Sequence, residues 1–311
     1  MSSILVVGAG ELGLAVLEAL SRHPKRGASK LAVLLRRDTI DSDAPSKKSQ
    51  ISRIKAIGAD IETGDFVDAP ADLVPVFRKY DVVMQCAGYG MKAGTQLGVT
   101  RAVLDAGVPR YFPWQYGVDY DSIGAGSSQP LFDEMLRVRG LLRSQRATGW
   151  TIISTGLFMS YIFLPDFGVV DLGNRTVRAL RGWDNTVTVT LPRDIGTMAA
   201  ETAFNPEDTD DRIVYIGGDT ISYGQLADLL EGALGMELVR EEWDTEFLRK
   251  KLEEEPDNLW LQYRNIFAKG VGVSWPREET LNHRRGISLT DVKAFVDENK
   301  EALAGELASR K

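Results

Sequence analysis

Residues 4–13 read ILVVGAGELG, an apolar run that leads into a glycine-rich turn. The turn holds Gly8, Gly10 and Gly13 at the spacing G-x-G-x-x-G, and the leucines that follow recur at helical intervals. Strand, turn and helix in this order are the context in which the motif binds the pyrophosphate of a dinucleotide. Gly8 permits the sharp turn, Gly10 lets the pyrophosphate approach the backbone, and Gly13 lets the helix pack closely on the strand. A structural turn in an unrelated α/β fold is the alternative.

The residues that open the predicted helix, Glu11 and Leu12, are expected to face the phosphates through their backbone N–H groups. A helix N-terminus carries unsatisfied N–H donors and the positive end of the helix dipole, and both favour an anion. We therefore assign Glu11 and Leu12, with the three glycines, to the cofactor site.

Short apolar runs alternate with amphipathic segments over residues 1–156. The runs that predict strands cover residues 4–7, 31–35, 59–62, 81–86, 110–112 and 150–154. The segments that predict helices cover residues 12–20, 47–57, 72–77, 94–106 and 130–147. Continuous apolar strands separated by helices imply a parallel sheet covered on both faces, with right-handed crossovers. The predicted fold class is therefore α/β, with a Rossmann-type doubly wound parallel sheet.

After residue 156 aromatic residues cluster and the regular alternation is lost. Residues 186–190 and 213–216 predict strands, and Ser222 is a candidate N-cap for a helix. Further helices are predicted for residues 194–204, 222–234, 244–254 and 288–307. We therefore expect an NAD(P)-binding Rossmann domain over residues 1–156 and a smaller substrate-binding cap over residues 157–311, interleaved with the sheet.

Two arginines, Arg36 and Arg37, directly follow the second predicted strand. NAD-binding domains usually have an acidic residue at the end of this strand, which accepts hydrogen bonds from the adenine ribose. An arginine fork instead suits the 2′-phosphate of NADP(H). Lys47, at the start of the next helix, adds positive charge. NADP(H) is therefore the expected cofactor, and the alternative is that Asp38 holds the ribose of NAD.

Composition argues against several other classes of protein. The chain has 311 residues, 43% hydrophobic and 26% charged, which is typical of a soluble globular protein. Its net charge of −7 argues against nucleic acid or an anionic membrane as a partner. No apolar run approaches the roughly 20 residues that a membrane helix needs. The single cysteine, Cys86, fits a reducing cytoplasm. The oligomeric state stays open.

Histidine is scarce, with only His23 and His283 in the whole sequence. A Ser-His-Asp or Cys-His catalytic site is therefore not expected, and neither is a His/Cys metal site. Asp119 and Asp121 have the chemistry of metal ligands, but so few ligands cluster there that a polar loop is the simpler interpretation. We predict no metal.

Together these motifs resemble the NmrA-like and isoflavone reductase-like family of atypical short-chain dehydrogenases. The matching pieces are the glycine motif at 8–13, Leu-Leu-Arg at 34–36, Gly-Asp at 64–65, Arg-Tyr-Phe-Pro at 110–113 and Ser-Thr-Gly-Leu-Phe at 154–158. The resemblance extends to about residue 234. It implies an NADPH-dependent reductase of a small aromatic or polycyclic compound of secondary metabolism.

The resemblance also implies site residues. We assign to the cofactor site Ala87, Gly88, Pro113 and Phe158, the last of which matches a phenylalanine that packs near the nicotinamide. We assign to the substrate site Trp114, Met135, Met159 and Tyr161. Trp114 follows the fifth predicted strand, at the edge where open α/β sheets bind ligands, although a role in the core alone is the alternative.

One departure from the family concerns the long helix. The reductases have a lysine three residues after a phenylalanine and three before a Val-Arg pair, and here that position is Met135. No lysine occurs between Lys92 and Lys250. Two other functions therefore stay open: a non-catalytic NADP-sensing regulatory protein, and an isomerase or cyclase that keeps the cofactor pocket.

A reductase without this lysine needs another proton source. The nearest candidate in the sequence is Tyr116, with Gln115 placed to orient a substrate oxygen. Without a cationic neighbour, the pKa of Tyr116 is expected near its ordinary value of about 10, so that it donates a proton but is a poor base. The alternative is that Tyr116 packs against the sheet and water supplies the proton.

Overall fold

The computed structural model describes residues 2–88 and 90–308, without the side chains of residues 306–308. Its contacts divide the chain into two compact units, and each unit is made of separated segments. Unit 1 comprises Met1–Tyr116, Glu134–Ile153 and Pro192–Val214. Unit 2 comprises Gly117–Asp133, Ser154–Leu191 and Tyr215–Lys311. The chain thus passes between the units several times, once close to the expected boundary at residue 156. The functional division into a cofactor domain and a substrate domain stays a prediction.

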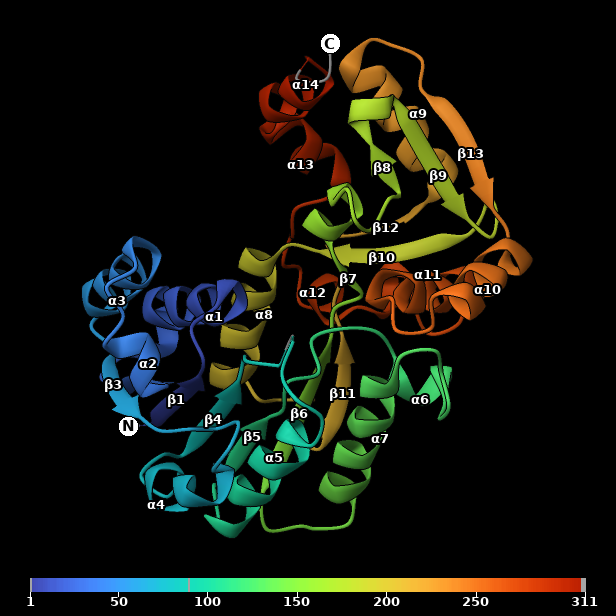
Figure 1. The fold of residues 1–311 in the computed structure, drawn as a ribbon. Helices are drawn as coiled ribbons and strands as arrows, with labels where there is room; N and C mark the ends of the chain where they lie inside the picture. The colour runs from blue at the N-terminus through green and yellow to red at the C-terminus, as the bar shows by residue number, and fades with distance from the viewer. Residues whose placement is uncertain (1, 89, 309–311) are drawn as a thin grey trace. The chain divides into compact units, whose positions relative to one another are not determined.

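Unit 1 is built on a seven-stranded sheet in the order β11-β6-β5-β4-β1-β2-β3 (Figure 1). Its strands are β1 (Ser3–Val7), β2 (Lys30–Leu35), β3 (Asp60–Thr63), β4 (Val82–Gln85), β5 (Arg110–Phe112), β6 (Gly149–Ser154) and β11 (Arg212–Tyr215). The pairs from β3 through to β6 are parallel. From β1 the chain adds β2 and β3 on one side, then crosses back to add β4, β5 and β6 on the other. The predicted doubly wound fold is therefore confirmed.

Two faces of this sheet are covered by helices (Figure 1). The helices are α1 (Glu11–Arg22), α2 (Arg37–Ile40), α3 (Pro45–Ile57), α4 (Val74–Phe77), α5 (Thr95–Asp105), α7 (Pro130–Arg143) and α8 (Pro192–Phe204). Leu5 of β1 is buried in one cluster with Val103 of α5 and Leu142 of α7. Neighbouring strand residues point to the opposite face, where α1 packs on α8. A Cβ at Gly196 of α8 would lie 2.5 Å from the carbonyl oxygen of Ala15.

One helix of unit 1 is shorter than the sequence suggests. The prediction of a helix over residues 130–147 is wrong at its end, because α7 stops at Arg143. The Gln145 side chain folds over the following turn, donating to the carbonyl of Thr148 (2.9 Å) and accepting from its N–H (2.9 Å). This local bonding replaces the helical pattern and leads the chain into β6.

Unit 2 contains two three-stranded sheets, in the orders β12-β10-β7 and β13-β9-β8. The strands are β7 (Leu157–Phe158), β8 (Val170–Asp171), β9 (Thr176–Leu180), β10 (Thr186–Thr190), β12 (Asp219–Ser222) and β13 (Val239–Trp243). The helices are α6 (Tyr120–Ile123), η3 (Met159–Phe163), α9 (Tyr223–Leu234), α10 (Thr245–Glu254), α11 (Leu259–Lys269), α12 (Leu281–Arg284), α13 (Val292–Glu298) and α14 (Lys300–Ala308). The predicted strand at 186–190 is confirmed, whereas β9, β13 and α11 were not predicted.

Capping residues explain where several of these helices begin. Ser222 caps α9 as predicted, in a reciprocal capping box with Gln225. The single helix predicted for residues 288–307 is wrong, because the segment forms α13 and α14. The Asp291 side chain accepts from the N–H of Ala294 and so sets the start of α13. Asn299 ends α13 and bonds back to the carbonyl of Phe295 (2.8 Å).

Candidate cofactor and substrate site

The three glycines of the turn are constrained by different neighbours. Gly8 has φ +85°, and a Cβ there would lie 2.6 Å from the Cβ of Ala87. A Cβ at Gly13 would lie 2.1 Å from the Gly8 carbonyl oxygen. Gly10 differs, because it has φ −64° and, apart from its two chain neighbours, no described residue has an atom within 4 Å of the position of its Cβ. The space beside Gly10 is therefore open, as the close approach of a pyrophosphate requires.

The turn is held in place from both sides. The N–H of Gly8 donates to the carbonyl of Leu34 in β2 (3.0 Å). From α3, the Gln50 side chain donates to the carbonyl of Ala9. Helix α1 starts at Glu11. Its N-cap residue is Gly10, so no side chain caps the first N–H groups of the helix. The first N–H groups of α1 therefore suit an anion, and these residues fit a dinucleotide. The contact of Gln50 with the turn was not predicted, because a single polar residue on a helix does not reveal its partner in the sequence.

The basic residues predicted for the 2′-phosphate lie beside the end of β2. Arg36 and Arg37 are exposed, and neither side chain forms an ion pair with a described residue. Lys47 is half-buried on α3. Backbone N–H bonding, chiefly from Asp68, lowers the pKa of Asp65, and the positive charge of Arg36 lowers it further. Arg36 therefore supplies positive potential at the edge where β2 and β3 end.

A buried polar network fixes the loop after β4. The Gln85 side chain donates to the side-chain oxygen of Gln96 (2.7 Å) and, at 3.4 Å, to the carbonyl of Ala87. Tyr111 donates to the side-chain oxygen of Gln85. These bonds place Ala87 and Gly88 at the carboxyl edge of the sheet, beside the glycine turn that Ala87 contacts.

Trp114 packs on this loop. A Cβ at Gly88 would lie 2.0 Å from Cδ2 of the Trp114 ring, so the indole occupies the space that a side chain at position 88 would fill. Trp114 is half-buried and Pro113 is buried. Trp114 therefore has a packing role. Part of its surface is exposed, and the predicted contact with a substrate stays a proposal.

Gln115 is engaged at both ends of its side chain. It is 1% exposed, and its Nε2 donates to the Met135 carbonyl (3.0 Å) while its Oε1 accepts from Nε of Arg139 (2.7 Å). An amide held in this way joins the segment after β5 to α7. The orienting role predicted for Gln115 stays untested, and these bonds give it a structural task.

The pKa of Tyr116 differs from the value expected from the sequence. Its hydroxyl is buried and makes no hydrogen bond of good geometry with the described residues. Burial raises the pKa of Tyr116 well above its usual value, and the neighbouring Cys86 thiol raises it further. The expected pKa near 10 is therefore wrong, because desolvation disfavours the phenolate. An enclosed hydroxyl is poorly placed to meet a substrate, and the catalytic role of Tyr116 stays a prediction.

Met135, at the position of the family's lysine, has no exposed surface. The preceding residue, Glu134, is 2% exposed and accepts three backbone N–H bonds, from Gly94 (2.8 Å), Gln96 (2.8 Å) and Leu97 (3.1 Å). Glu134 thus caps α5 from α7, a contact that the sequence did not reveal. The Met135 side chain is packed inside the protein. Its predicted contact with a substrate stays a proposal.

The remaining predicted site residues belong to unit 2. Phe158 ends β7, and Met159 opens η3. Met159 has no exposed surface, whereas Phe158 and Tyr161 are half-buried with ring centroids 5.6 Å apart. Of the three, Phe158 and Tyr161 keep surface that a ligand can cover.

Metal chemistry finds no support in the described residues. They contain no group of three or more His, Cys, Asp or Glu side chains that could hold a metal ion. Asp119 accepts hydrogen bonds from the hydroxyls of Ser122 (2.5 Å) and Tyr215 (3.0 Å), as in a polar loop. Within the same residues, no helix is long and apolar enough to span a membrane.

Comparison with known proteins decides the family. The NmrA-like family model matches residues 1–269. The chain belongs to the NmrA-like family. One relative, an NmrA-like family domain-containing oxidoreductase of Gibberella moniliformis, is 48% identical over 295 residues, covering 94% of this chain and 97% of that protein. Phenylcoumaran benzylic ether reductase Pyrc5 of Pyrus communis is 29% identical over 319 residues, covering 96% and 97%.

Solved structures show the same fold for this NmrA-like chain. A crystal structure of isoflavone reductase matches with a TM-score of 0.79 at 19% identity, covering 96% of this chain and 99% of that one. The complex of leucoanthocyanidin reductase with NADPH from Vitis vinifera matches with a TM-score of 0.74 at 19% identity, covering 99% and 100%. The resemblance inferred from the motifs is therefore confirmed at the level of family and fold.

Proposed function

We propose that this NmrA-like protein is an NADP(H)-dependent reductase of a small aromatic or polycyclic metabolite. The observation that carries the proposal is the open space at Gly10 at the uncapped start of α1. Relatives support the reaction class, since one is named an oxidoreductase and another a benzylic ether reductase. A related fold was solved with NADP+ and (+)pinoresinol. When bound, the cofactor would supply a hydride.

The chain's own residues would bind and orient this cofactor. The N–H groups at the start of α1 would hold the pyrophosphate, because they are uncapped and lie at the positive end of the helix dipole. Arg36 and Arg37 would bind the 2′-phosphate, because neither guanidinium has an ion-pair partner among the described residues.

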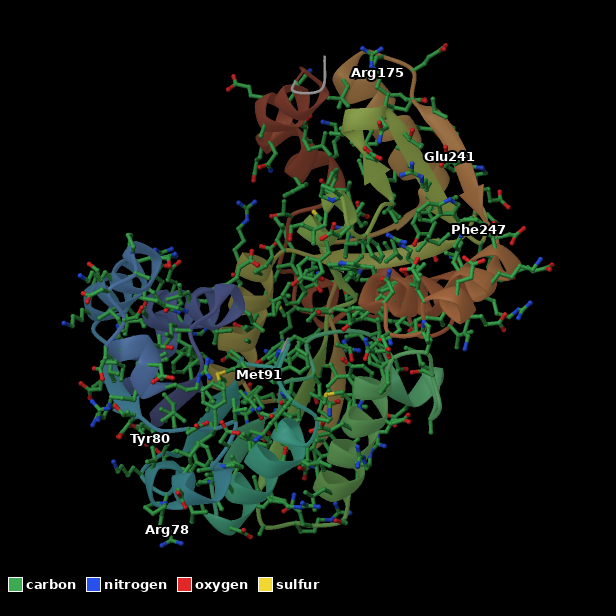
Figure 2. The ribbon with its side chains drawn as sticks, viewed as in Figure 1. Arg78, Tyr80, Met91, Arg175, Glu241 and Phe247 are labelled. Atoms are coloured by element: carbon green, nitrogen blue, oxygen red, sulfur yellow. The ribbon has the colours of Figure 1, made fainter. Side chains whose placement is uncertain are left out.

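Arg36→Ala tests the choice of cofactor. We expect NADPH to bind wild-type protein more tightly than NADH, and Arg36→Ala to weaken NADPH binding by about tenfold or more, since a charge-assisted bond is lost. NADH binding should stay within about twofold. Calorimetric titration of both cofactors measures this. The matched control is Arg78→Ala, another exposed arginine of unit 1, at the end of α4 (Figure 2). Equal affinities of the wild type for the two cofactors would contradict the proposal.

A second function, a non-catalytic NADP sensor, is favoured by the packing around Met135. The residue at the lysine position is fully buried, and the Tyr116 hydroxyl beside the sheet is enclosed. Following NADPH absorbance with aromatic ketones, enones and benzylic ethers separates the functions. Oxidation of NADPH supports the reductase, whereas tight binding without turnover supports the sensor. Product formed without oxidation of the cofactor indicates an isomerase or cyclase.

A further inference from the structure

Three half-buried aromatic rings follow one another in unit 2. The Phe158 and Tyr161 centroids lie 5.6 Å apart, and the Tyr161 and Trp260 centroids lie 6.2 Å apart in an edge-to-face arrangement. Phe158 and Tyr161 come from β7 and η3, whereas Trp260 comes from α11, about 100 residues further along the chain. We call Phe158, Tyr161 and Trp260 the aromatic row. Its third member was not predicted, because α11 itself was not.

The aromatic row is backed by the core of unit 2. Trp260 meets Phe167 edge to face, with centroids 6.0 Å apart, and Phe167 meets Phe267 in the same way at 5.9 Å. Phe167 is 1% exposed and Phe267 is 2% exposed. Trp260 therefore has one side against a closed aromatic core, yet it stays half-buried. Such a ring offers a firm apolar surface to an aromatic ligand.

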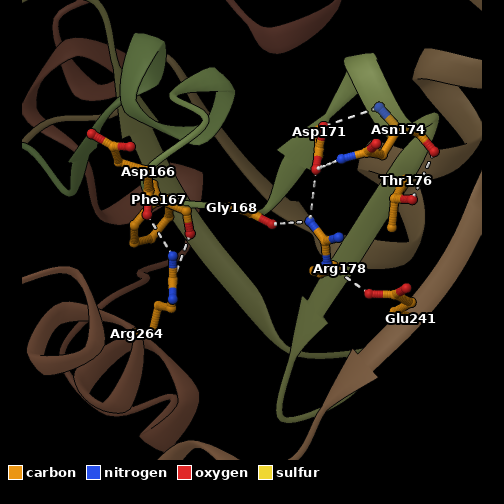
Figure 3. Close-up of polar contacts among 9 residues, drawn as sticks. All are labelled: Asp166, Phe167, Gly168, Asp171, Asn174, Thr176, Arg178, Glu241 and Arg264. Carbon is orange, nitrogen blue, oxygen red and sulfur yellow. Dashed lines mark hydrogen bonds and ion pairs between the residues drawn. The ribbon is translucent and has the colours of Figure 1, made fainter. Parts of the chain in front are cut away.

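Helix α11 is anchored at the turn that carries Trp260. Asn258 caps the helix by accepting from the N–H groups of Trp260 and Leu261. Arg264 lies one turn after Trp260, at a spacing that places both side chains on the same face. Its Nε donates to the Phe167 carbonyl (2.8 Å), and its second guanidinium nitrogen donates to the carbonyl of Asp166 (Figure 3). Arg264 therefore ties α11 to the segment after η3.

Arg264 and Arg178 both pack against the ring of Trp243. The Arg264 guanidinium lies 5.0 Å from the ring centroid of Trp243, and that of Arg178 lies at the same distance. Burial lowers the pKa of Arg264, and the positive charge of Arg178 lowers it further. Arg178 also donates to the carbonyl of Gly168 (3.0 Å) and to the carboxylate of Glu241 (2.6 Å) (Figure 3). Two arginines thus hold the segment at residues 166–168, which leads from the aromatic row into β8.

We propose that Trp260 contacts the aromatic ring of the substrate and that Arg264 positions Trp260 against Tyr161. The assignment rests on the proposed function, since it names a residue that would select aromatic substrates for that site. Trp260 contributes the largest ring of the row. Arg264 acts through the backbone of residues 166–167 and makes no substrate contact of its own.

The test compares an aromatic enone with an aliphatic one. Binding of benzylideneacetone and of 3-penten-2-one to NADP+-loaded protein is measured by calorimetry. We expect Trp260→Ala to weaken benzylideneacetone binding about tenfold, because an aromatic contact is lost. The affinity for 3-penten-2-one should stay within about twofold of the wild-type value. Trp260→Phe should restore most of the aromatic affinity. Trp183→Ala is the control, because Trp183 is also half-buried in unit 2 but stacks on Arg240 (5.7 Å).

Arg264→Lys tests the positioning role. It keeps the positive charge but loses the paired donation to two carbonyls. We expect Arg264→Lys to weaken the binding of benzylideneacetone about threefold or more. The affinities for NADPH and for 3-penten-2-one should stay unchanged. The proposal is overturned if wild-type protein does not bind benzylideneacetone, if Trp260→Ala binds it normally, or if Trp183→Ala weakens it equally. Binding that depends on Trp260 without any oxidation of NADPH would instead reject the reductase function alone.

Discussion

At the scale of the residue, burial decides which polar groups are available for chemistry. Tyr116 and Gln115 follow β5 at the edge of the sheet where a ligand is expected, yet neither side chain is open to solvent. The Gln115 amide is held by α7, and the Tyr116 hydroxyl faces Cys86, whose own pKa is raised to about 12 by burial. The backbone near Gly10, by contrast, leaves open space. Cofactor binding is thus better supported than acid catalysis.

Tyr116→Phe tests this at the same scale. A proton-donating Tyr116 predicts a fall in turnover of roughly 10²-fold. We expect turnover within about threefold of wild type instead, because the hydroxyl is enclosed by protein. Steady-state rates on a substrate found in the enone panel, with NADPH affinity as the control, decide between them.

Tyr116→Phe should also change how the free energy of unfolding depends on pH. The folded-state pKa of Tyr116 is raised, so the unfolded chain loses this proton first, and stability is lost as pH rises above about 10. Tyr116→Phe should reduce that loss by about 1.4 kcal/mol per pH unit between pH 10 and the folded-state pKa. Urea unfolding at pH 8 and pH 11 measures it, and an unchanged pH dependence would contradict the burial argument.

At the scale of the element, one carboxylate joins two helices. Glu134 of α7 accepts the N–H groups of Gly94, Gln96 and Leu97 at the start of α5. The N-cap residue Gly94 has no side chain to do this, and its φ of +89° favours glycine. A buried carboxylate also complements the positive end of the α5 dipole. Helix α5 is therefore fixed by a residue that belongs to another helix.

Glu134→Ala should cost about 2–4 kcal/mol in free energy of unfolding, since the two buried N–H groups of Gln96 and Leu97 and the partly buried N–H of Gly94 lose their acceptor. Glu134→Gln should cost less, because one oxygen can still accept from Gln96 and Leu97. Urea unfolding followed by circular dichroism measures both variants. A loss below about 0.5 kcal/mol for Glu134→Ala would show that water replaces the carboxylate.

At the scale of the whole molecule, the chain builds each unit from separated segments, so a local ligand can report on global stability. The glycine turn lies in the first segment of unit 1, and α8, which packs on α1, lies in the last. Binding to the folded state alone stabilises a protein by about 2.7 kcal/mol at a ligand concentration of 100 times Kd. NADPH should therefore raise Tm by about 5 °C or more.

Gly10→Ala should abolish this rise while leaving the ligand-free Tm within about 2 °C. Apart from the two chain neighbours, no described residue has an atom within 4 Å of the new Cβ, whereas a bound pyrophosphate would meet it. Gly13→Ala is the contrasting variant, expected to lower the ligand-free stability by roughly 2 kcal/mol or more, because its Cβ would overlap the Gly8 carbonyl. Thermal unfolding with and without NADPH measures both. A normal NADPH shift in Gly10→Ala would place the cofactor elsewhere.

The sequence by itself determined the features that depend on near neighbours. The glycine turn, the alternation of apolar strands with helices and the capping of α9 by Ser222 are read within a few residues of chain. The turn and the alternation predicted the doubly wound sheet, and the further short motifs at residues 34–36, 64–65, 110–113 and 154–158 predicted the family. The end of α7 and the break between α13 and α14 were missed, because the side chains of Gln145 and Asn299 compete locally with the helical pattern.

Only the tertiary structure decided which residues meet across long stretches of chain. The packing of Trp114 on Gly88, the capping of α5 by Glu134 and the enclosure of Tyr116 leave no pattern in the sequence. The same holds for Trp260 beside Tyr161, which lie about 100 residues apart. The physical reason is that periodicity records which face of an element is apolar, whereas burial and hydrogen bonding depend on the partner that this face finds in the folded chain.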